Sequence, residues 1–440
     1  MNCECAICSN NKPFDMPKEI IDAVVKEELV LFCGAGVSTE KKTVLPYSFY
    51  SNIRDELDIT DDLSFCDLMQ KYNDRPNGRR NLLKKIRERF KYIDSFPELH
   101  RQATAFHREL SQIYQIKTII TTNWDTYFEE YCGAVPITIP EDISLFDDTS
   151  RHVLKIHGSI NNLSSIVATK SDYEACYERL QNGVIGAQLK NILATKTVVF
   201  IGFSFGDEDF SQILKYLKNE MGNVFPHIYV VTIDDKLEKR LNYDNCTTIV
   251  TSGEHFIHTL KNYLKENGSI VNTGIEEDVE ISLSIMEDLH GKVSRINIKT
   301  FPSVIYTLAY QDGVIHAWER YLKMNKTGEY NRPGYIGGLA GKYQTIAQKC
   351  HASKNYWDES YYEGYINGLV FIAACGQSSD VVEKFPFIYL PNSKLDLNDL
   401  SIYHAELERV SSGKGQYHVM AKKSIKEQCG EGMVVHHPPY

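Results

Sequence analysis

The chain has 440 residues, which exceeds one ordinary domain of roughly 150 residues, so two or three domains are expected. Apolar residues make up 42% and charged residues 24%, values close to those of soluble globular proteins, which argues against long disordered segments. The formal charge of -10 argues against a generally basic surface that would neutralise phosphates. Direct nucleic-acid binding is therefore not expected.

The cysteines and the apolar runs bear on the cell compartment. No stretch reaches the roughly 20 apolar residues of a membrane helix, and the first residues lack a signal-peptide pattern, so we expect a cytoplasmic protein without a membrane partner. Eleven cysteines, an odd number spread widely, are typical of reduced thiols. Only Cys3, Cys5 and Cys8 cluster. No fourth ligand is evident nearby, so a loose terminus is favoured over a zinc site, and no metal is expected.

Short apolar runs rich in β-branched residues recur along the first 235 residues, each bounded by Gly, Asn, Asp or Ser. They lie at 29–33, 117–121, 153–156, 197–201 and 227–233. Such runs are typical of buried parallel strands, and helical periods such as 17–27 lie between them. This alternation predicts an α/β fold with a doubly wound, Rossmann-like parallel sheet.

Two further patterns set the domain organisation. Residues 47–114 have helical periodicity without strand signals, which predicts a helical lobe inserted into the sheet domain. A Gly- and Asn-containing stretch at 265–278 marks a boundary. We expect an N-terminal tail over 1–17, a sheet domain over 18–266, and a separate, mainly helical or α+β domain over 275–440.

A glycine-rich turn follows the first predicted strand. Its sequence is Cys33-Gly34-Ala35-Gly36-Val37-Ser38. Glycines at this place let the backbone approach a pyrophosphate, whose charge the next helix N-terminus would stabilise. The alternative is a plain tight turn, since Gly-x-Gly also occurs at 413–415 and 430–432, where no strand precedes it.

Polar side chains follow the next two predicted strands. Asn123 can hydrogen-bond a ribose or a water, and Asp125 can either orient Asn123 or cap the helix that starts near Thr126. His157 follows the third strand and is a potential base, although a lone histidine is more often structural. Because ligands of open α/β sheets lie beyond the carboxyl ends of the strands, these groups are predicted to share one site.

The last two predicted strands also end in polar groups. Gly202 permits close approach of a ligand, and Ser204 can donate to a phosphate or ribose, while Asp207 is expected to cap the next helix. Asp234 can accept from the hydroxyls of an adenosine ribose, or cap a helix over 235–240.

The order of these motifs resembles the sirtuin family, with a Gly-Ala-Gly-x-Ser loop, a Thr-x-Asn-x-Asp strand end, a His-Gly strand end and then Gly-x-Ser. The sequence Phe-His-Arg-Glu-Leu at 106–110 is similar to the helix that precedes the family's Asn strand. The resemblance covers somewhat over half of the chain and implies NAD as the ligand.

Site roles follow from the resemblance. It implies that the pyrophosphate is held by Gly34, Ala35, Gly36 and Ser38. Asn123 and Asp125 would contact the nicotinamide ribose, and His157 would be the base. Gly202 and Ser204 would contact the adenosine half.

Two departures from the family pattern narrow the implied activity. Sirtuin deacylases carry a zinc ribbon of two Cys-x-x-Cys pairs after the catalytic His, whereas only Cys176 lies between His157 and Gly202. The family's Gly-Ile-Pro-Asp-Phe-Arg segment is reduced here to 44–47, Val-Leu-Pro-Tyr. Both features resemble the sirtuin-like effectors of bacterial anti-phage defence, which hydrolyse NAD to arrest an infected cell.

The resemblance thus implies an NAD glycohydrolase that releases nicotinamide and ADP-ribose. Nicotinamide leaves as a neutral molecule, so a base and a positioning group suffice, and His157 and Asn123 can supply them. The alternatives are protein deacylation, ADP-ribosyl transfer, or a module that senses a nucleotide without cleaving it. The resemblance also implies a homo-oligomer controlled by a sensor or ATPase partner protein or a phage trigger, with 275–440 as the assembly or regulatory domain.

Overall fold

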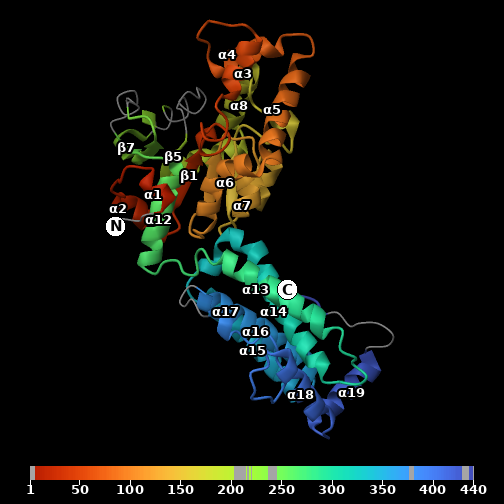
Figure 1. Ribbon diagram of the computed structural model, residues 1–440. Helices are drawn as coiled ribbons and strands as arrows, with labels where there is room; N and C mark the ends of the chain where they lie inside the picture. Colours follow the sequence, from red (N-terminus) through yellow and green to blue (C-terminus); the bar gives the residue numbers. More distant parts are fainter. Residues whose placement is uncertain are drawn as a thin grey trace. The chain divides into compact units, whose positions relative to one another are not determined.

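The computed structural model describes residues 5–202, 215, 218–219, 221–235, 245–375, 381–428 and 436–439. The chain divides into two compact units (Figure 1). The first unit comprises Met1–Asn267 with Lys326–Gly328, and the second comprises Gly268–Asn325 with Glu329–Tyr440. Among the described helices, none has the length and apolar character needed to cross a membrane.

The first unit is built on a parallel sheet, and the described residues supply seven strands in the order β3-β4-β2-β1-β5-β6-β7. The strands are β1 Leu29–Cys33, β2 Thr118–Thr121, β3 Val135–Ile137, β4 His152–Lys155, β5 Thr197–Ile201, β6 Ile228–Thr232 and β7 Cys246–Val250. The predicted doubly wound α/β class is confirmed. The sequence patterns missed β3 and β7, which form the two edges of the sheet.

Helices cover both faces of this sheet, and three more form a lobe beside it. The described helices of this unit are α1 Ala6–Ser9, α2 Lys18–Val25, α3 Phe49–Glu56, α4 Phe65–Asn73, α5 Gly78–Ser95, α6 Pro97–Ser111, α7 Tyr127–Cys132, α8 Lys170–Asn182, α9 Val184–Thr195 and α12 Gly253–Glu266. On one face, Phe32 stacks on Phe200 with ring centroids 5.0 Å apart, and side chains of α8 and α9 cover them. Since side chains alternate along a strand, Leu31 and Val199 point to the opposite face. Helix α2 lies against β1 and β5, and α12 lies against β6.

The helical segment between β1 and β2 has two parts. Helices α3, α4 and α5 enclose a small core around Ile53, Leu68 and Leu82, and Ile166 and Ala168 from the segment after β4 complete it. Helix α6 instead packs against α7 and α12, beside the sheet. The region expected as one lobe over 47–114 is thus a three-helix lobe followed by a helix of the sheet layers.

The second unit is mainly helical, as the sequence predicts. Its helices are α13 Glu276–Val293, α14 Val304–Met324, α15 Tyr335–Ala352, α16 Tyr356–Cys375, α17 Val381–Lys384, α18 Leu400–Ser411 and α19 Gln416–Gln428. Helices α14 and α16 approach closely at Gly364, where a Cβ would lie 1.9 Å from the Tyr310 carbonyl oxygen. Tyr361 and Tyr365 are buried in the core between these helices. The abundance of tyrosine here therefore reflects core packing.

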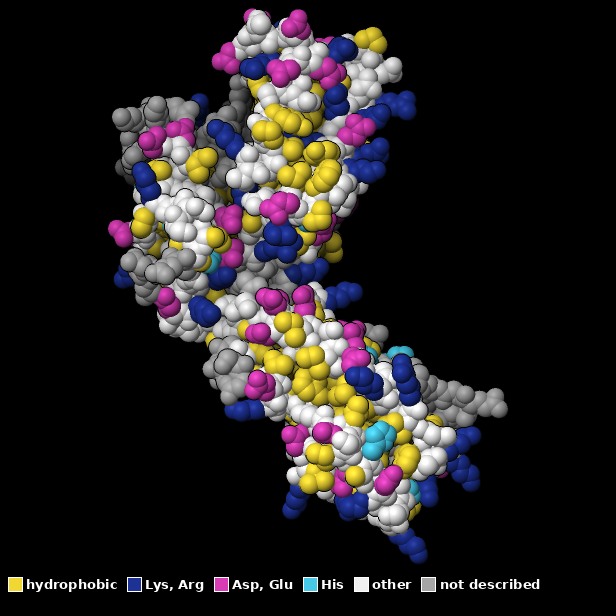
Figure 2. All heavy atoms as spheres, in the orientation of Figure 1, with side chains coloured by type: hydrophobic (Ala, Val, Ile, Leu, Met, Phe, Trp, Pro, Cys, Tyr) yellow, Lys and Arg dark blue, Asp and Glu magenta, His cyan; other side chains and the backbone are white. Residues whose placement is uncertain are grey.

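The surface shows no segregation of charge on the face drawn in Figure 2. Basic and acidic side chains are interspersed there over each unit, with hydrophobic side chains between them. A continuous basic stripe of the kind that follows a phosphate backbone is not present on that face among the described residues.

Candidate functional site

The strand register brings the predicted site residues to one edge of the sheet. Cys33 of β1 is paired with Thr121 of β2 and with Ile201 of β5, and Thr121 is paired with Lys155 of β4. The segments that follow these strands therefore begin at the same level, at the carboxyl edge. They contain the glycine loop 34–38, Asn123, His157 and Gly202.

The other predicted positions follow β5 and β6. Asp234 follows β6 at the same edge, and its backbone N–H donates to Thr232 Oγ1 at 3.1 Å. Ser204, the capping role expected of Asp207, and most of the helix expected over 235–240 lie outside the described residues.

The glycine loop is held by direct backbone contact with the segment after β5. Residues Ala35–Val37 form a 3-10 turn, and the Gly36 N–H donates to the Gly202 carbonyl oxygen at 3.0 Å. A Cβ on Gly36 would lie 2.9 Å from that oxygen, and a Cβ on Gly202 would lie 2.7 Å from the Val37 nitrogen. Gly202 also has φ +64°, the left-handed region that favours glycine. Both glycines are thus required by the contact between the two loops.

Most amides of the glycine loop are used within the fold. Gly34 N–H donates to the Ile201 carbonyl, Val37 N–H to the Gly34 carbonyl, and Ser38 N–H to the Ala35 carbonyl. Within the described part of the chain, no backbone carbonyl accepts from the Ala35 amide. The Ala35 N–H is therefore a donor that the loop can offer to an anion.

Asn123 is oriented by a buried chain of hydrogen bonds. Its Nδ2 donates to the Gly34 carbonyl oxygen at 3.2 Å and to Ser38 Oγ at 3.3 Å. Ser38 Oγ in turn donates to Asp125 Oδ2 at 2.9 Å. The side chain of Asn123 is 4% exposed, and its Oδ1 is buried without a hydrogen-bond partner among the described residues. A buried unmatched acceptor is costly, so it marks a place where a ligand hydroxyl or a water would donate.

Asp125 accepts two hydrogen bonds beside Asn123. Its Oδ2 accepts from Ser38, and its Oδ1 accepts from the Tyr127 backbone N–H at 3.3 Å, at the start of α7. Burial raises the pKa of Asp125 to about 6, while the Lys155 charge and the Ser38 hydrogen bond oppose the rise. The carboxylate thus links the first turn of α7 to the Asn123 network.

Lys155 is a site-supporting residue that the sequence patterns did not single out. Its side chain is fully buried at the end of β4, where Nζ lies 2.9 Å from Glu129 Oε1 and also donates to the Asp125 backbone carbonyl. A buried ammonium requires such partners, because an isolated charge in the interior is strongly unfavourable. A lysine inside the otherwise apolar run 153–156 was the signal that could have identified it.

His157 lies in a turn that only glycine can complete. The ring is 4% exposed and meets the ring of Tyr173 on α8 edge-on, with centroids 4.9 Å apart. The next residue, Gly158, has φ +82°, and a Cβ there would lie 2.1 Å from the Ser165 carbonyl oxygen. The His157 carbonyl accepts from the Val167 N–H at 3.0 Å. These contacts fix the backbone that carries the imidazole.

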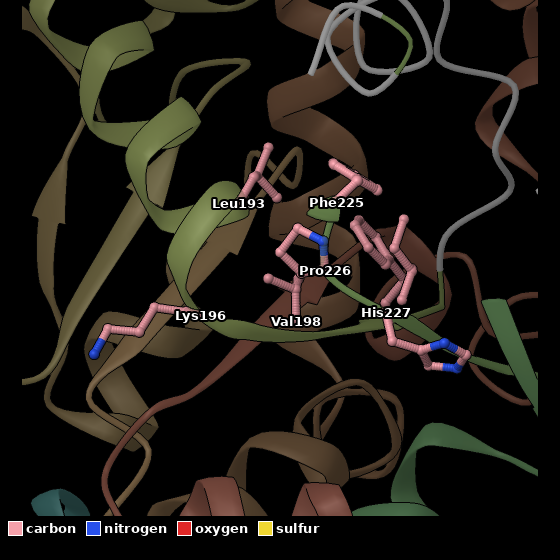
Figure 3. A pocket seen from close by; sticks show the side chains of 8 residues that line it. Leu193, Lys196, Val198, Phe225, Pro226 and His227 are labelled. Atoms are coloured by element: carbon pink, nitrogen blue, oxygen red, sulfur yellow. The ribbon is translucent and has the colours of Figure 1, made fainter. Parts of the chain in front are cut away.

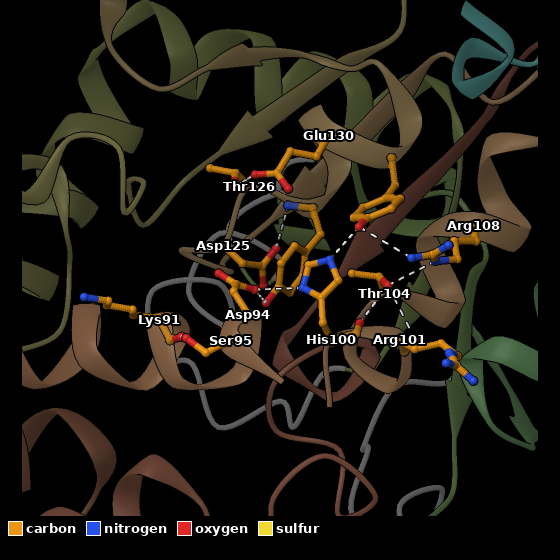
Figure 4. Close-up of polar contacts among 12 residues, drawn as sticks. Lys91, Asp94, Ser95, His100, Arg101, Thr104, Arg108, Asp125, Thr126 and Glu130 are labelled. Atoms are coloured by element: carbon orange, nitrogen blue, oxygen red, sulfur yellow. Dashed lines mark hydrogen bonds and ion pairs between the residues drawn. The ribbon is translucent and has the colours of Figure 1, made fainter. Parts of the chain in front are cut away.

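A second polar network anchors α7, the helix after Asp125 (Figure 4). Tyr127 Oη donates to Asp94 Oδ1 at 2.8 Å, and the same oxygen lies 2.9 Å from His100 Nδ1. His100 Nε2 contacts Tyr131 Oη. Two residues of α7 are thereby tied to the end of α5 and the start of α6, which keeps the segment between Asn123 and α7 in place.

A shallow pocket lies at the opposite end of the strands (Figure 3). Leu193, Val198 and Phe225 are among its lining residues, at the amino ends of β5 and β6. Both ring nitrogens of His227 are engaged there, at 2.7 Å from Asn245 Oδ1 and 2.7 Å from Thr247 Oγ1. This pocket does not belong to the carboxyl-edge site.

Comparison with known proteins gives a family match within the first unit. Residues 117–250 match the family described as SIR2-like domain. This part of the chain is sirtuin-like. The expected sirtuin resemblance is confirmed, and the matched segment contains Asn123, His157 and Gly202.

Several curated proteins are similar to the SIR2-like region. "NAD(+) hydrolase ThsA" of Cytobacillus dafuensis is 32% identical over 213 residues, which is 47% of this chain and 41% of that protein. The protein of the same name from Enterococcus faecium is 29% identical, over 46% of this chain and 42% of its own length. "Defense-associated sirtuin 2" of Bacillus subtilis is 21% identical over 65% of this chain and 29% of its own. The chain thus matches less than half the length of these relatives.

The part of the SIR2-like domain between His157 and Gly202 differs from the zinc ribbon of sirtuin deacylases. This stretch forms helices α8 and α9, which pack on the sheet. Its one cysteine, Cys176, is buried, and its Sγ donates to the Ile156 carbonyl oxygen at 3.6 Å. Cys176 therefore serves packing in this domain.

Proposed function

We propose that this chain hydrolyses NAD at the nicotinamide-ribose bond, releases nicotinamide and ADP-ribose, and acts in the bacterial cytoplasm as an NAD-depleting effector of anti-phage defence. The SIR2-like domain and the relatives named NAD(+) hydrolase and defense-associated sirtuin support this proposal. The observation that carries it is the buried, unmatched Oδ1 of Asn123, held at the carboxyl edge by Ser38 and Asp125.

The nicotinamide half of NAD would meet the groups after β2 and β4. Asn123 Oδ1 would accept from a ribose hydroxyl or from the attacking water, and His157 would take up the proton. The nicotinamide ring is cationic in NAD and leaves as a neutral molecule, so the reaction needs no general acid. Positioning of water and sugar as positive charge develops on the ribose is then the main requirement. Asp125 acts through Ser38 and is a positioning residue in this scheme.

The pyrophosphate and the adenosine half of NAD would lie along the two glycine segments. The pyrophosphate would meet the loop 34–38, where the Ala35 N–H is available. The adenosine half would meet Gly202 and Ser204, and the carboxylate of Asp234 would accept from its ribose hydroxyls. The direct contact between Gly36 and Gly202 supports this placement, because the pyrophosphate and the adenosine half are neighbouring parts of NAD and the two segments lie side by side.

Turnover of NAD by the purified full-length chain tests the proposal. Nicotinamide and ADP-ribose are measured with and without an acetylated peptide, which separates hydrolysis from deacylation and ADP-ribosyl transfer. Asn123→Ala and His157→Ala should each lower NAD turnover by about 10²- to 10⁴-fold. His227→Ala is the matched control, since it removes two hydrogen bonds at the opposite end of the same sheet.

Three results would count against the proposal. Turnover near that of the unmodified chain in a folded His157 or Asn123 variant would refute their catalytic assignment. Products that appear only when the acetylated peptide is present would indicate transfer or deacylation. Binding of NAD by calorimetry without cleavage, also in infected-cell extract that supplies a trigger, would indicate a sensing module.

We further propose that residues 275–440 form an assembly or regulatory module of a homo-oligomer that responds to a sensor or ATPase partner or to a phage trigger. Every residue that we assign to NAD precedes position 235. In the second unit, His316 contacts Tyr361 and His351 contacts Glu359, which are structural contacts. A fragment ending at Asn267 should bind NAD but differ from the full chain in molecular mass or in triggered activity. Equal mass, basal activity and triggered activity would contradict the regulatory role.

A further inference from the structure

The first described residues of the chain lie against a helix that is far away in the sequence. The short helix α1 contacts α12. Cys5 precedes α1, and Cys8 lies within it. Cys5 Sγ lies 3.3 Å from His258 Nε2 on α12, and the ligand atoms of Cys5, Cys8 and His258 all lie within 4.8 Å of one another. Two thiols and one imidazole thus face a common point.

This arrangement suits a tetrahedral metal ion. Zinc binds thiolate sulfur at about 2.3 Å and imidazole nitrogen at about 2.0 Å, so its ligand atoms are separated by about 3.5–3.8 Å. Cys5 Sγ and His258 Nε2, 3.3 Å apart, are already close to these separations, and the other pairs of ligand atoms lie within 4.8 Å. The Cys5-x-x-Cys8 spacing is also the one that zinc sites use most often for a pair of thiolates.

The protonation of His258 is set for metal binding through Nε2. Nδ1 lies 3.0 Å from Glu109 Oε2, and since a carboxylate only accepts, Nδ1 carries the hydrogen. Asn262 Nδ2 donates to Nε2 at 3.0 Å, so that nitrogen carries the lone pair, and a bound metal ion would replace this hydrogen bond. Carboxylate-histidine pairs of this kind are the common second shell of zinc sites, where they fix the tautomer and orient the ring.

The carboxylate of Glu109 is itself held in place. Lys261 Nζ lies 2.7 Å from Glu109 Oε2, the oxygen that also faces His258. The side chains of His258 and Glu109 are 12% and 20% exposed, respectively. Both are therefore largely packed between α6 and α12, whereas Cys5 and Cys8 are half-buried and leave a route for an ion.

We propose that Cys5, Cys8 and His258 bind a zinc-class divalent cation that fastens the segment 5–9 to α12. Binding converts both thiols to thiolates and releases two protons to solvent, and His258 binds through the lone pair of Nε2. The described residues supply these three ligands, and Cys3 lies outside the described residues. The sequence expectation of no metal rested on the neighbourhood of Cys5 and Cys8 in the chain, and it is the fold that supplies His258.

Metal content of the full-length chain tests this proposal. The protein is reduced with a non-chelating phosphine, loaded with zinc, exchanged into metal-free buffer and measured by plasma mass spectrometry. One equivalent of zinc is expected for the unmodified chain. Cys5→Ser, Cys8→Ser and His258→Ala should lose it, and Cys66→Ser, which changes a half-buried thiol on α4, should retain it. Glu109→Gln should weaken zinc affinity about 10- to 100-fold without removing a ligand.

Cobalt substitution of the unmodified chain provides a readout that does not depend on any variant folding. Co²⁺ bound here should show thiolate charge-transfer absorption in the near ultraviolet and intense visible bands of tetrahedral coordination. The proposal is overturned by zinc-free protein after loading, by a full equivalent of zinc in the folded Cys5 and His258 variants, or by a cobalt spectrum without thiolate bands. These measurements are independent of NAD turnover, so failure of one proposal is distinguishable from failure of the other.

Discussion

Substitution of Gly202 by alanine probes the contact between the two glycine segments. The residue has φ +64°, and the left-handed conformation costs a non-glycine residue about 1–2 kcal/mol. The new Cβ would also lie 2.7 Å from the Val37 nitrogen and 2.9 Å from the Gly36 carbonyl carbon. These neighbours are mainly backbone, which must shift, and overpacking of this kind costs about 1–3 kcal/mol. Gly202→Ala should therefore destabilise the first unit by about 2–5 kcal/mol.

A second glycine of the same unit separates the two contributions. Gly222 has φ +53°, but a Cβ there would meet none of the described residues within 4 Å. Gly222→Ala should therefore cost only the conformational part, about 1–2 kcal/mol. Both variants are compared by urea unfolding, following the transition of the first unit, and their affinity for NAD is measured by calorimetry. Because the contact positions the loop 34–38, only Gly202→Ala should also weaken NAD binding.

The comparison has a clear refuting result. If Gly202→Ala and Gly222→Ala shift the unfolding midpoint equally and bind NAD equally, the close approach of Gly36 and Gly202 does not constrain the site. Total stabilities of domains are about 5–15 kcal/mol, so a variant at the upper end of the estimate can fail to accumulate as folded protein. Loss of folded Gly202→Ala alone, with folded Gly222→Ala, agrees with the expectation.

Other substitutions test the Asn123 network. Ser38→Ala removes a hydrogen bond to a buried carboxylate, so it should lower the free energy of unfolding in urea by about 1.5–3 kcal/mol. It should also lower nicotinamide release, as Asn123→Ala does, because Ser38 Oγ accepts from Asn123. The folded pKa of Asp125, about 6, exceeds its ordinary value of 3.8, so this group's stabilising contribution is complete at low pH and is lost as the pH rises through 6. The free energy of unfolding of Asp125→Asn, relative to that of the unmodified chain, should therefore rise by up to about 3 kcal/mol between pH 4 and pH 7. A pH-independent difference would contradict the raised pKa. Lys155→Met leaves Glu129 without its partner and should destabilise by about 3–5 kcal/mol, measured as a lowered melting temperature.

The central strands could be predicted from the sequence, and the edge strands could not. Strands β1 and β5 are buried on both faces, so their residues form apolar runs that stand out in the chain. Strand β3 has three residues and contains Pro136, and most of β7 is half-buried, so neither gives a continuous apolar signal. The boundary stretch expected over 265–278 overlaps the start of α13, because Glu276 and Glu277 lie in the first turn of that helix, where acidic residues are favoured.

The candidate site was predictable only to the level of strand ends. The rule that ligands lie beyond the carboxyl ends of parallel strands groups Asn123 and His157, and the register agrees with that grouping. The bond from Ser38 to Asp125 joins residues 87 positions apart, and no local pattern indicates it. The same holds for His258, which lies 253 positions from Cys5. Such pairs arise from the fold as a whole.

The place of β1 in the sheet has a consequence for synthesis of the protein. This strand is made early, yet Leu29 pairs with Thr197 of β5 on one side and Val30 with Thr118 of β2 on the other. At about 5–20 residues per second, a ribosome needs roughly 10–30 s to proceed from β1 to β5, and during that time an apolar strand has no partner on one edge. Chaperone binding to nascent chains should be strongest in this interval. The contact of Gly36 with Gly202 can form only afterwards, so an unfinished chain lacks the arrangement that we assign to NAD. In a cell that makes this protein, the proposed NAD hydrolysis would then come only from chains whose sheet is complete.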